Sequence, residues 1–255
     1  NSIASWNWKA NGQGSANTDG SINSTVSVNT TAGFSIIKYT ATGNVGTIGH
    51  GLNAVPKMLI FKDLEDNGGS DWYVHHTSTG VNGRLILNGT NAVANNTGFL
   101  NQVLPTSTLI TLGTTSQVNN VGNDFICYAF AEKNGYSKFG SYTGNGNADG
   151  TFSYTGFKPA WVIIKRYDNS GESWWIFDNK RSTSGGTNVV NSGLLPNVNN
   201  AEYSNNATFK LDFLSNGFKL RNNDSALNAS GGTYIYMAFA EAPLVGSNNV
   251  PCTAR

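Results

Sequence analysis

The sequence predicts an all-β protein made of two tandem β-sandwich domains of the jelly-roll type, with few or no helices. Short apolar runs lie between clusters of Gly, Asn, Asp and Ser, turn signals recur about every 8 to 12 residues, and a stretch of about 100 residues occurs twice. In addition, no window of about eleven residues or more keeps an uninterrupted apolar face at helical spacing.

The internal repeat is visible as similarity without gaps. At a shift of about 103 residues, residues 55–76 align with residues 158–179. Further along, the shift grows by about six residues, as one loop insertion would cause, and residues 118–132 align with residues 227–241. Each copy therefore ends on the same four residues, Ala-Phe-Ala-Glu.

The repeat sets the expected domain boundaries. We expect a first β-sandwich repeat at residues 33–135 and a second repeat with a C-terminal tail at residues 136–255. Residues 2–12 resemble the closing strand of another such repeat, and residues 12–33 are rich in Gly, Ser, Asn and Thr. Residues 1–32 are therefore interpreted as a closing strand plus a linker, and the chain as the C-terminal part of a longer or processed protein.

Runs rich in β-branched and aromatic residues, each bounded by turn residues, predict the strands. In the first copy these runs are residues 34–40, 57–64, 71–77, 84–89, 108–113 and 124–130. In the second copy they are residues 152–156, 160–167, 173–179, 209–214, 217–221 and 233–239. The last run of each copy is apolar on both faces, which is typical of a central strand covered on both sides.

Composition argues against several classes of partner. Charged residues make up 12% of the chain, about half of the roughly 25% usual for soluble domains, and the formal net charge is +1. Without a basic stripe, nucleic acid and anionic membrane are poor candidate partners. No run reaches the roughly 18 apolar residues that a membrane span needs. The two cysteines, Cys127 and Cys252, are interpreted as unpaired.

Two glutamates at equivalent positions are the first candidates for chemistry. Glu132 and Glu241 end the two copies, and a carboxylate pair could act as general acid and base if the repeat symmetry brought both to one axis. The alternative is an exposed charge at a strand end, or an ion pair with a lysine such as Lys62 or Lys165. We favour this alternative because structural ion pairs often mimic active sites. No catalytic residue is therefore predicted.

Metal and cofactor sites are not predicted either. His75 and His76 are adjacent on a predicted strand, so their side chains should point to opposite faces and cannot share one metal ion. The loops at residues 17–21, 66–71 and 145–150 carry oxygen ligands suited to calcium. They lack the full ligand pattern of a calcium loop, so we interpret them as Asx turns.

One tryptophan stands out from the repeat. Trp72 and Trp175 occupy equivalent positions and are interpreted as core residues, whereas Trp174 replaces Asp71 of the first copy. It should therefore be exposed or covered by a partner, and it could stack on a sugar or form a contact between subunits. The candidate ligand-binding residues are Trp174, Asp178, His75, Asn145, Asn147 and Asp149.

Four stretches carry a family resemblance: residues 31–62, 127–166, 213–221 and the segment from Ala229 to the end of the chain. They resemble the C-terminal repeats of virion proteins of tailed bacteriophages, identified as tail-fibre or structural proteins of phages from aquatic bacteria. The resemblance covers nearly the whole chain. It implies a repetitive β protein on the surface of the virion that assembles as a homo-oligomer, for which we expect a trimer, together with other virion proteins.

Three functional hypotheses follow from the resemblance. The first is a structural module of a virion appendage, such as a tail fibre, that contributes to attachment to glycan on the host surface. The second is a capsid or tail decoration or fibre subunit with a role in assembly alone. The third is a polysaccharide depolymerase, which we disfavour because no acid pair can be placed.

Overall fold

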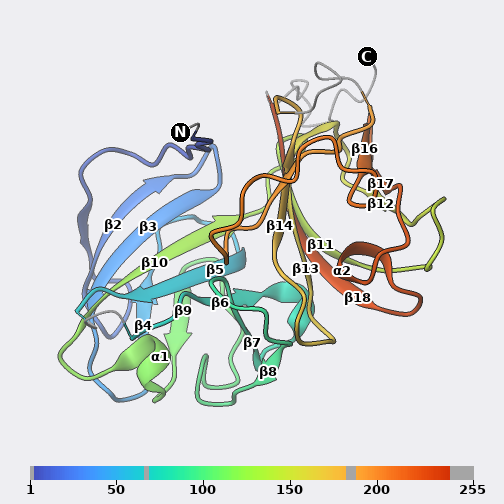
Figure 1. The fold of residues 1–255 in the computed structure, drawn as a ribbon. Helices are drawn as coiled ribbons and strands as arrows, with labels where there is room; N and C mark the ends of the chain where they lie inside the picture. The colour runs from blue at the N-terminus through green and yellow to red at the C-terminus, as the bar shows by residue number, and fades with distance from the viewer. Residues whose placement is uncertain (1–2, 66–68, 182–187, 242–255) are drawn as a thin grey trace. The chain divides into compact units, whose positions relative to one another are not determined.

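The computed structural model describes residues 3–65, 69–181 and 188–241. The chain is nearly all β, with several sheets and only short helices among the described residues, as the sequence predicts (Figure 1). It packs into two compact units. The first unit contains residues 1–70 and 97–131, and the second contains residues 71–96 and 132–255.

The first unit is built on five antiparallel strands in the order β1-β2-β3-β10-β5. These strands are β1 (Ser15–Asn17), β2 (Ser24–Asn29), β3 (Phe34–Thr40), β10 (Asp124–Ala131) and β5 (Pro56–Asp63). A second sheet pairs β4 (Gly46–Gly49) with β9 (Leu109–Leu112), and the short helix α1 (Ser116–Asn119) precedes β10.

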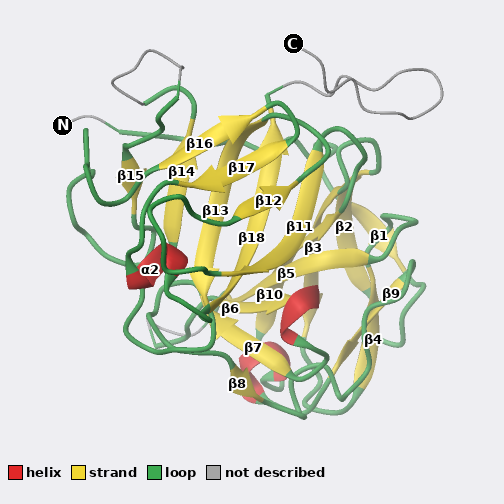
Figure 2. Ribbon diagram, turned by 90° about the vertical axis from the view of Figure 1, so that its right-hand side faces the viewer, coloured by secondary structure: helices red, strands yellow, loops and turns green. Residues whose placement is uncertain are grey.

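The second unit contains a sheet in the order β11-β18-β13-β14-β15 and a three-stranded sheet in the order β12-β17-β16 (Figure 2). The first comprises β11 (Ser137–Thr143), β18 (Thr233–Ala240), β13 (Pro159–Arg166), β14 (Trp175–Asp178) and β15 (Gly193–Leu194). The second comprises β12 (Phe152–Tyr154), β17 (Gly217–Leu220) and β16 (Leu211–Leu214). This unit also holds α2 (Ser225–Asn228), β6 (Tyr73–His76), the 3-10 turn η1 (Thr77–Thr79), β7 (Gly83–Ile86) and β8 (Ala94–Asn95).

The core of the second unit lies between its two sheets. Val162 and Phe177 from the larger sheet and Leu211, Phe213 and Phe218 from the smaller one belong to a single buried cluster. Because alternate residues of a strand point to opposite faces, these residues bury one face of each sheet. The result is a two-layer sandwich.

The two copies of the repeat fold alike. Strands β10 and β18 each lie between two neighbours, so the Ala-Phe-Ala-Glu strands are central, as predicted. The Tyr39 hydroxyl donates to Val118 O at 2.6 Å, and the equivalent Tyr142 hydroxyl donates to Leu227 O at 2.7 Å. Burial raises the pKa of both phenols well above the usual value. Each tyrosine therefore ties a strand to the short helix of its own copy.

The boundaries differ from the expectation in three respects. Residues 3–11 form no strand, and the predicted linker contains strands β1 and β2. Residues 71–96, which were assigned to the first repeat, pack with the second unit. Strand β2 forms because Val26 and Val28 alternate with polar residues. This Ser/Asn/Thr-rich segment therefore still has an apolar face, while its backbone pairs with β3.

The structure also bears on the cysteines and on the search for a membrane span. Cys127 is a free, buried thiol, and Cys252 lies outside the described residues. Among the described residues, no helix has the length and apolar character that crossing a membrane requires.

Candidate functional site

Two exposed aromatic side chains lie on one face of β12. Phe152 is 41% exposed and Tyr154 is 61% exposed, whereas Ser153 between them is buried. Because side chains i and i+2 of a strand share a face, the two rings are neighbours on the surface of the three-stranded sheet. We name this surface, formed by Phe152, Tyr154, Asp149, Asp212, Lys219 and Arg221, the aromatic platform.

A glycine beneath the rings explains their position. In the register of β12 and β17, Phe152 lies opposite Lys219 and Tyr154 opposite Gly217. A Cβ atom at Gly217 would come within 2.8 Å of the Phe152 ring and 2.1 Å of Ser153 O. Only glycine therefore allows the ring and the backbone of β17 to approach this closely.

Charged side chains border the rings. Lys219 Nζ lies 2.9 Å from Asp149 Oδ1, and Arg221 lies 3.3 Å from the same oxygen and 3.2 Å from Asp212 Oδ2. The hydrogen bond from Lys219, together with its charge, lowers the pKa of the Asp149 carboxyl. The platform therefore combines two apolar ring faces with donors and acceptors of nearly balanced charge.

The loop before β12 brings Asp149 to the platform. Asn145 Oδ1 accepts from the backbone of Asn147, and Asn147 Oδ1 accepts from the backbone of Asp149, which makes two consecutive Asx turns. The completely buried Asn228 holds the loop from below, because its amide group donates to Asn145 Oδ1 and Asn147 O, both at 2.9 Å. The predicted residues Asn145, Asn147 and Asp149 are all exposed, and Asp149 reaches the platform through its ion pairs with Lys219 and Arg221.

The expectation that Trp174 is exposed or covered by a partner is wrong. It is 1% exposed, and its indole Nε1 donates to Ile86 O at 2.8 Å. Its backbone N–H is held by Asn197 Oδ1 at 3.1 Å. Residues 71–96 of the same chain therefore take the place of the partner that the sequence suggested. Trp175 is buried as predicted, whereas Trp72 is only partly buried.

His75 and Asp178, the remaining predicted ligand-binding residues, are also buried. His75 is 1% exposed, and its Nδ1 lies 3.4 Å from Gly83 O. Asp178 is 4% exposed and accepts from the backbone of Lys180 at 2.8 Å and from Arg181 Nε at 2.5 Å. Both side chains are occupied inside the fold, so the structure does not join them with the exposed loop residues in one site.

The two repeat glutamates have separate lysine partners. Glu132 pairs with Lys138 at 2.8 Å and Glu241 with Lys180 at 2.5 Å. Lys62 and Lys165, which were named as examples of partners, instead donate to the backbone carbonyls of Ser70 and Arg166. The ion-pair interpretation is therefore confirmed, with different lysines.

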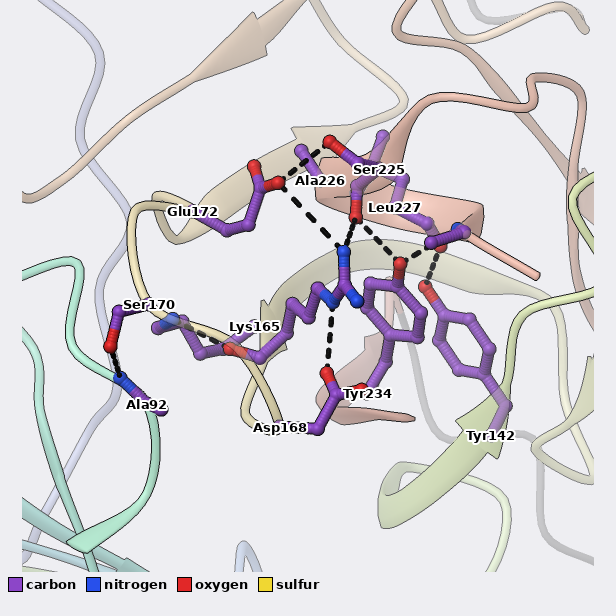
Figure 3. A network of polar contacts seen from close by, with 12 residues as sticks. Ala92, Tyr142, Lys165, Asp168, Ser170, Glu172, Ser225, Ala226, Leu227 and Tyr234 are labelled. Atoms are coloured by element: carbon purple, nitrogen blue, oxygen red, sulfur yellow. Dashed lines mark hydrogen bonds and ion pairs between the residues drawn. The ribbon is translucent and has the colours of Figure 1, made fainter. Parts of the chain in front are cut away.

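A network of polar contacts surrounds the end of β13 (Figure 3). Arg166 Nε lies 2.8 Å from Asp168, and its Nη1 donates to Ser225 O at 3.2 Å, which joins the β13–β14 loop to α2. Ser225 also donates to Glu172 and accepts from the Tyr234 hydroxyl at 2.7 Å. These bonds fasten the helix against the larger sheet of the second unit.

Lys165 is the most perturbed base of this network. It is completely buried, and desolvation lowers its pKa to about 8, although the carboxylates of Glu172 and Asp168 oppose the shift. A lysine with a pKa near neutrality is a candidate nucleophile or base. Because no part of Lys165 is exposed, we interpret it as structural.

We next consider clusters of side chains that could bind a metal ion. Within the described ranges, no group of three or more His, Cys, Asp or Glu side chains is placed to hold a metal ion. The loop at residues 17–21 also contains an Asx turn, because Asp19 N donates to Asn17 Oδ1. Residues 66–68 of the predicted loop at residues 66–71 lie outside the described residues.

The aromatic rings of the platform were missed in the sequence. At the 103-residue shift that aligns the repeats, Phe152 and Tyr154 fall on Gly49 and Gly51 of the first copy. The substitution of two glycines by two aromatic residues, both on the same face of a predicted strand, is the signal that identifies them. The aromatic platform is therefore a feature of the second copy.

Comparisons with known proteins give a family. No curated protein and no solved structure matches the chain. One family model matches residues 1–243, which is nearly the entire sequence. The chain therefore belongs to the family described as a domain of unknown function (DUF7483).

Proposed function

We propose that this chain is a structural and attachment module of a bacteriophage virion appendage, such as a tail fibre, and that it binds host-surface glycan on the aromatic platform. The sequence resemblance supports the virion context. The observation that carries the binding role is the pair of exposed rings, Phe152 and Tyr154, bordered by charged side chains.

The chemistry of the platform suits a sugar. Aromatic rings offer a flat apolar face to the C–H face of a pyranose, and a tyrosine adds a hydroxyl at its edge. Lys219 and Arg221 are donors only, whereas Asp149 is an acceptor, so sugar hydroxyls find partners of both kinds. The side chain of Asp149 is 75% exposed, which leaves its free lone pairs within reach of a ligand.

We propose binding rather than hydrolysis. A glycosidase needs one carboxyl group that is protonated and a second that is free to act as base or nucleophile. Lys219 and Arg221 hold Asp149 ionised, so this carboxylate is not suited to donate a proton near neutral pH. Asp212 is occupied by an ion pair with Arg221.

The module would act as a homo-oligomer, for which we propose a trimer, together with other virion proteins on the particle surface. Several copies of a weak glycan site raise the avidity of a particle without any new contact. The platform is thus suited to a receptor-binding role in which each single site binds weakly.

Binding of the purified chain to polysaccharide of candidate host bacteria tests the proposal. We expect Phe152→Ala and Tyr154→Ala each to weaken binding at least about tenfold, and Tyr154→Phe to retain most of it, because stacking depends on the ring. Val198→Ala, which removes an exposed apolar side chain elsewhere in the same unit, is the matched control. If the intact chain binds no polysaccharide, the attachment role is wrong and a role in assembly alone remains. Release of reducing sugar would contradict the non-catalytic role.

A further inference from the structure

The first unit carries a surface depression whose lining residues are distant in sequence from the platform residues. It has a volume of about 320 Å³ and lies over β1, β2, β3 and the start of β10. Its lining residues are Ala16, Asn23, Ser24, Thr25, Lys38, Tyr39, Thr40 and Asp124. All of them belong to the first unit, so the depression does not depend on how the two units are arranged.

The strand register explains the hollow. Ala16 on β1 pairs with Thr25 on β2, and Thr25 pairs with Lys38 on β3, so these three side chains form one row across a face of the sheet. The methyl group of Ala16 is much shorter than its neighbours, and it leaves space between them. Ala16, Thr25 and Lys38 are all exposed.

An ion pair forms one side of the depression. Lys38 Nζ lies 2.6 Å from Asp124 Oδ2, and the Thr40 hydroxyl donates to Asp124 Oδ1 at 2.7 Å. The hydrogen bond between the two partners raises the pKa of Lys38 and lowers that of Asp124, so both are charged at neutral pH. The ammonium group has further hydrogens to donate and each carboxylate oxygen has a further lone pair.

The second copy of the repeat lacks this chemistry. At the shifts that align the copies, Lys38 falls on Ser141, Thr40 on Thr143 and Asp124 on Thr233. The buried tyrosine beneath them is the same in both copies, Tyr39 and Tyr142. The framework has therefore been kept while the surface has diverged, and the charged pair is not required by the fold of the repeat.

We propose that this depression is a second saccharide-binding site, in which vicinal hydroxyls of one sugar ring accept from Lys38 and donate to Asp124. Thr25 and Asn23 also line the depression, with groups that both donate and accept. The balanced charge disfavours a free ion, and the polar lining disfavours an apolar ligand. The choice of a sugar rests on the proposed glycan attachment, but the site and its residues do not. The chain would then carry one sugar site on each unit.

Amide chemical-shift mapping by nuclear magnetic resonance tests the site directly. The probes are D-galactose, D-mannose, L-rhamnose and N-acetyl-D-glucosamine, each titrated to about 50 mM, a range suited to millimolar dissociation constants. We expect at least one sugar to shift the amides of Thr25, Lys38 and Asp124 in a saturable manner. If no sugar shifts them in the intact chain, the proposal is wrong.

Variants separate this site from the platform. Ala16→Leu fills the hollow and should weaken binding at least about tenfold, as should Lys38→Met, which removes the ammonium group but keeps the length of the side chain. Lys57→Met removes a lysine of the same unit that does not line the depression, and it should leave binding unchanged. Equal binding by Ala16→Leu and the intact chain would overturn the assignment.

Phe152→Ala serves as the reciprocal control. It should abolish shifts on the platform and leave those of Thr25 and Lys38 intact. If platform shifts are absent in the intact chain while those of Thr25 and Lys38 saturate, the platform proposal fails and this inference stands. Loss of the Thr25 and Lys38 shifts in Phe152→Ala would overturn the inference, because it would mean that the two surfaces are not independent sites.

Discussion

Replacement of Asn228 by alanine should destabilise the second unit and release the loop that carries Asp149. Asn228 is completely buried. Its Nδ2 donates to Asn145 Oδ1 and Asn147 O at 2.9 Å and to Asn222 O at 2.7 Å, and its Oδ1 accepts from Asn145 N at 3.0 Å. The side chain therefore connects α2 to two loops.

The magnitude follows from these contacts: the two hydrogens of Nδ2 are shared among three acceptors, so with the bond to Oδ1 they count as about three hydrogen bonds. At about 0.5 to 1.5 kcal/mol net each, their loss should lower the free energy of unfolding by about 1.5 to 4.5 kcal/mol. The expected loss is large because Asn222 is itself buried and its carbonyl would lose this donor. Asn228→Asp should cost at least as much, because a carboxylate would face the same three acceptor oxygens.

Urea unfolding followed by tryptophan fluorescence measures this free energy, since Trp161, Trp174 and Trp175 all lie in the second unit. Asn200→Ala, at an exposed position of the same unit, is the matched control and should change stability by less than about 0.5 kcal/mol. A loss below about 1 kcal/mol for Asn228→Ala would refute the reasoning, and so would an equal loss in the control.

Three further predictions concern buried groups. Burial lowers the pKa of His76 to about 3 and of His75 to about 4, so the unfolded state binds more protons below pH 6.5 and stability falls as the pH falls. From pH 7 to 4.5 we expect each histidine to cost roughly 2 to 3 kcal/mol, a loss that His76→Gln should reduce in urea titrations. Burial of Lys165 acts with the same sign in an alkaline window, because its folded pKa of about 8 lies below 10.5: stability should rise between pH 8 and 10, and Lys165→Met should remove this rise. Trp174→Phe should lower the thermal midpoint through loss of the bond to Ile86 O, at a cost of about 2 kcal/mol, while polysaccharide binding stays unchanged; weaker binding would return Trp174 to the candidate site.

The repeated framework could be predicted from the sequence because its signals are local or periodic. The strands around the Ala-Phe-Ala-Glu motifs alternate or run apolar over short stretches, and two copies in one chain reinforce each other. Strands β1 and β2 were missed because Ser, Thr and Asn dominate them, and their pairing depends on a neighbouring strand rather than on their own propensity. Residues 3–11 were wrongly predicted to contain a strand, because they resemble the closing strand of a repeat but form no strand in the structure. In the structure this segment is held by the side chains of Ser27 and Asn29 instead of by a ladder of backbone bonds.

The candidate site was predicted only in part. Asn145, Asn147 and Asp149 were identified from their loop composition; the structure leaves all three exposed and pairs Asp149 with Lys219 and Arg221 of the platform. Trp174 was wrongly predicted to be exposed or covered by a partner, and Phe152 and Tyr154 were not identified as candidates. A strand pattern shows which residues share a face, but it does not show what covers that face.

The sequence by itself therefore determined the β class, the duplication and the central position of strands β10 and β18. These features depend on residue spacing, which the chain carries along its length. The tertiary structure alone decided which aromatic residues are accessible. Trp174 is buried because Ile86, 88 residues earlier in the chain, lies against it, whereas Phe152 and Tyr154 stay exposed on a sheet whose other face forms the core. Accessibility is a property of contacts between distant segments, and such contacts leave no periodic trace in the sequence.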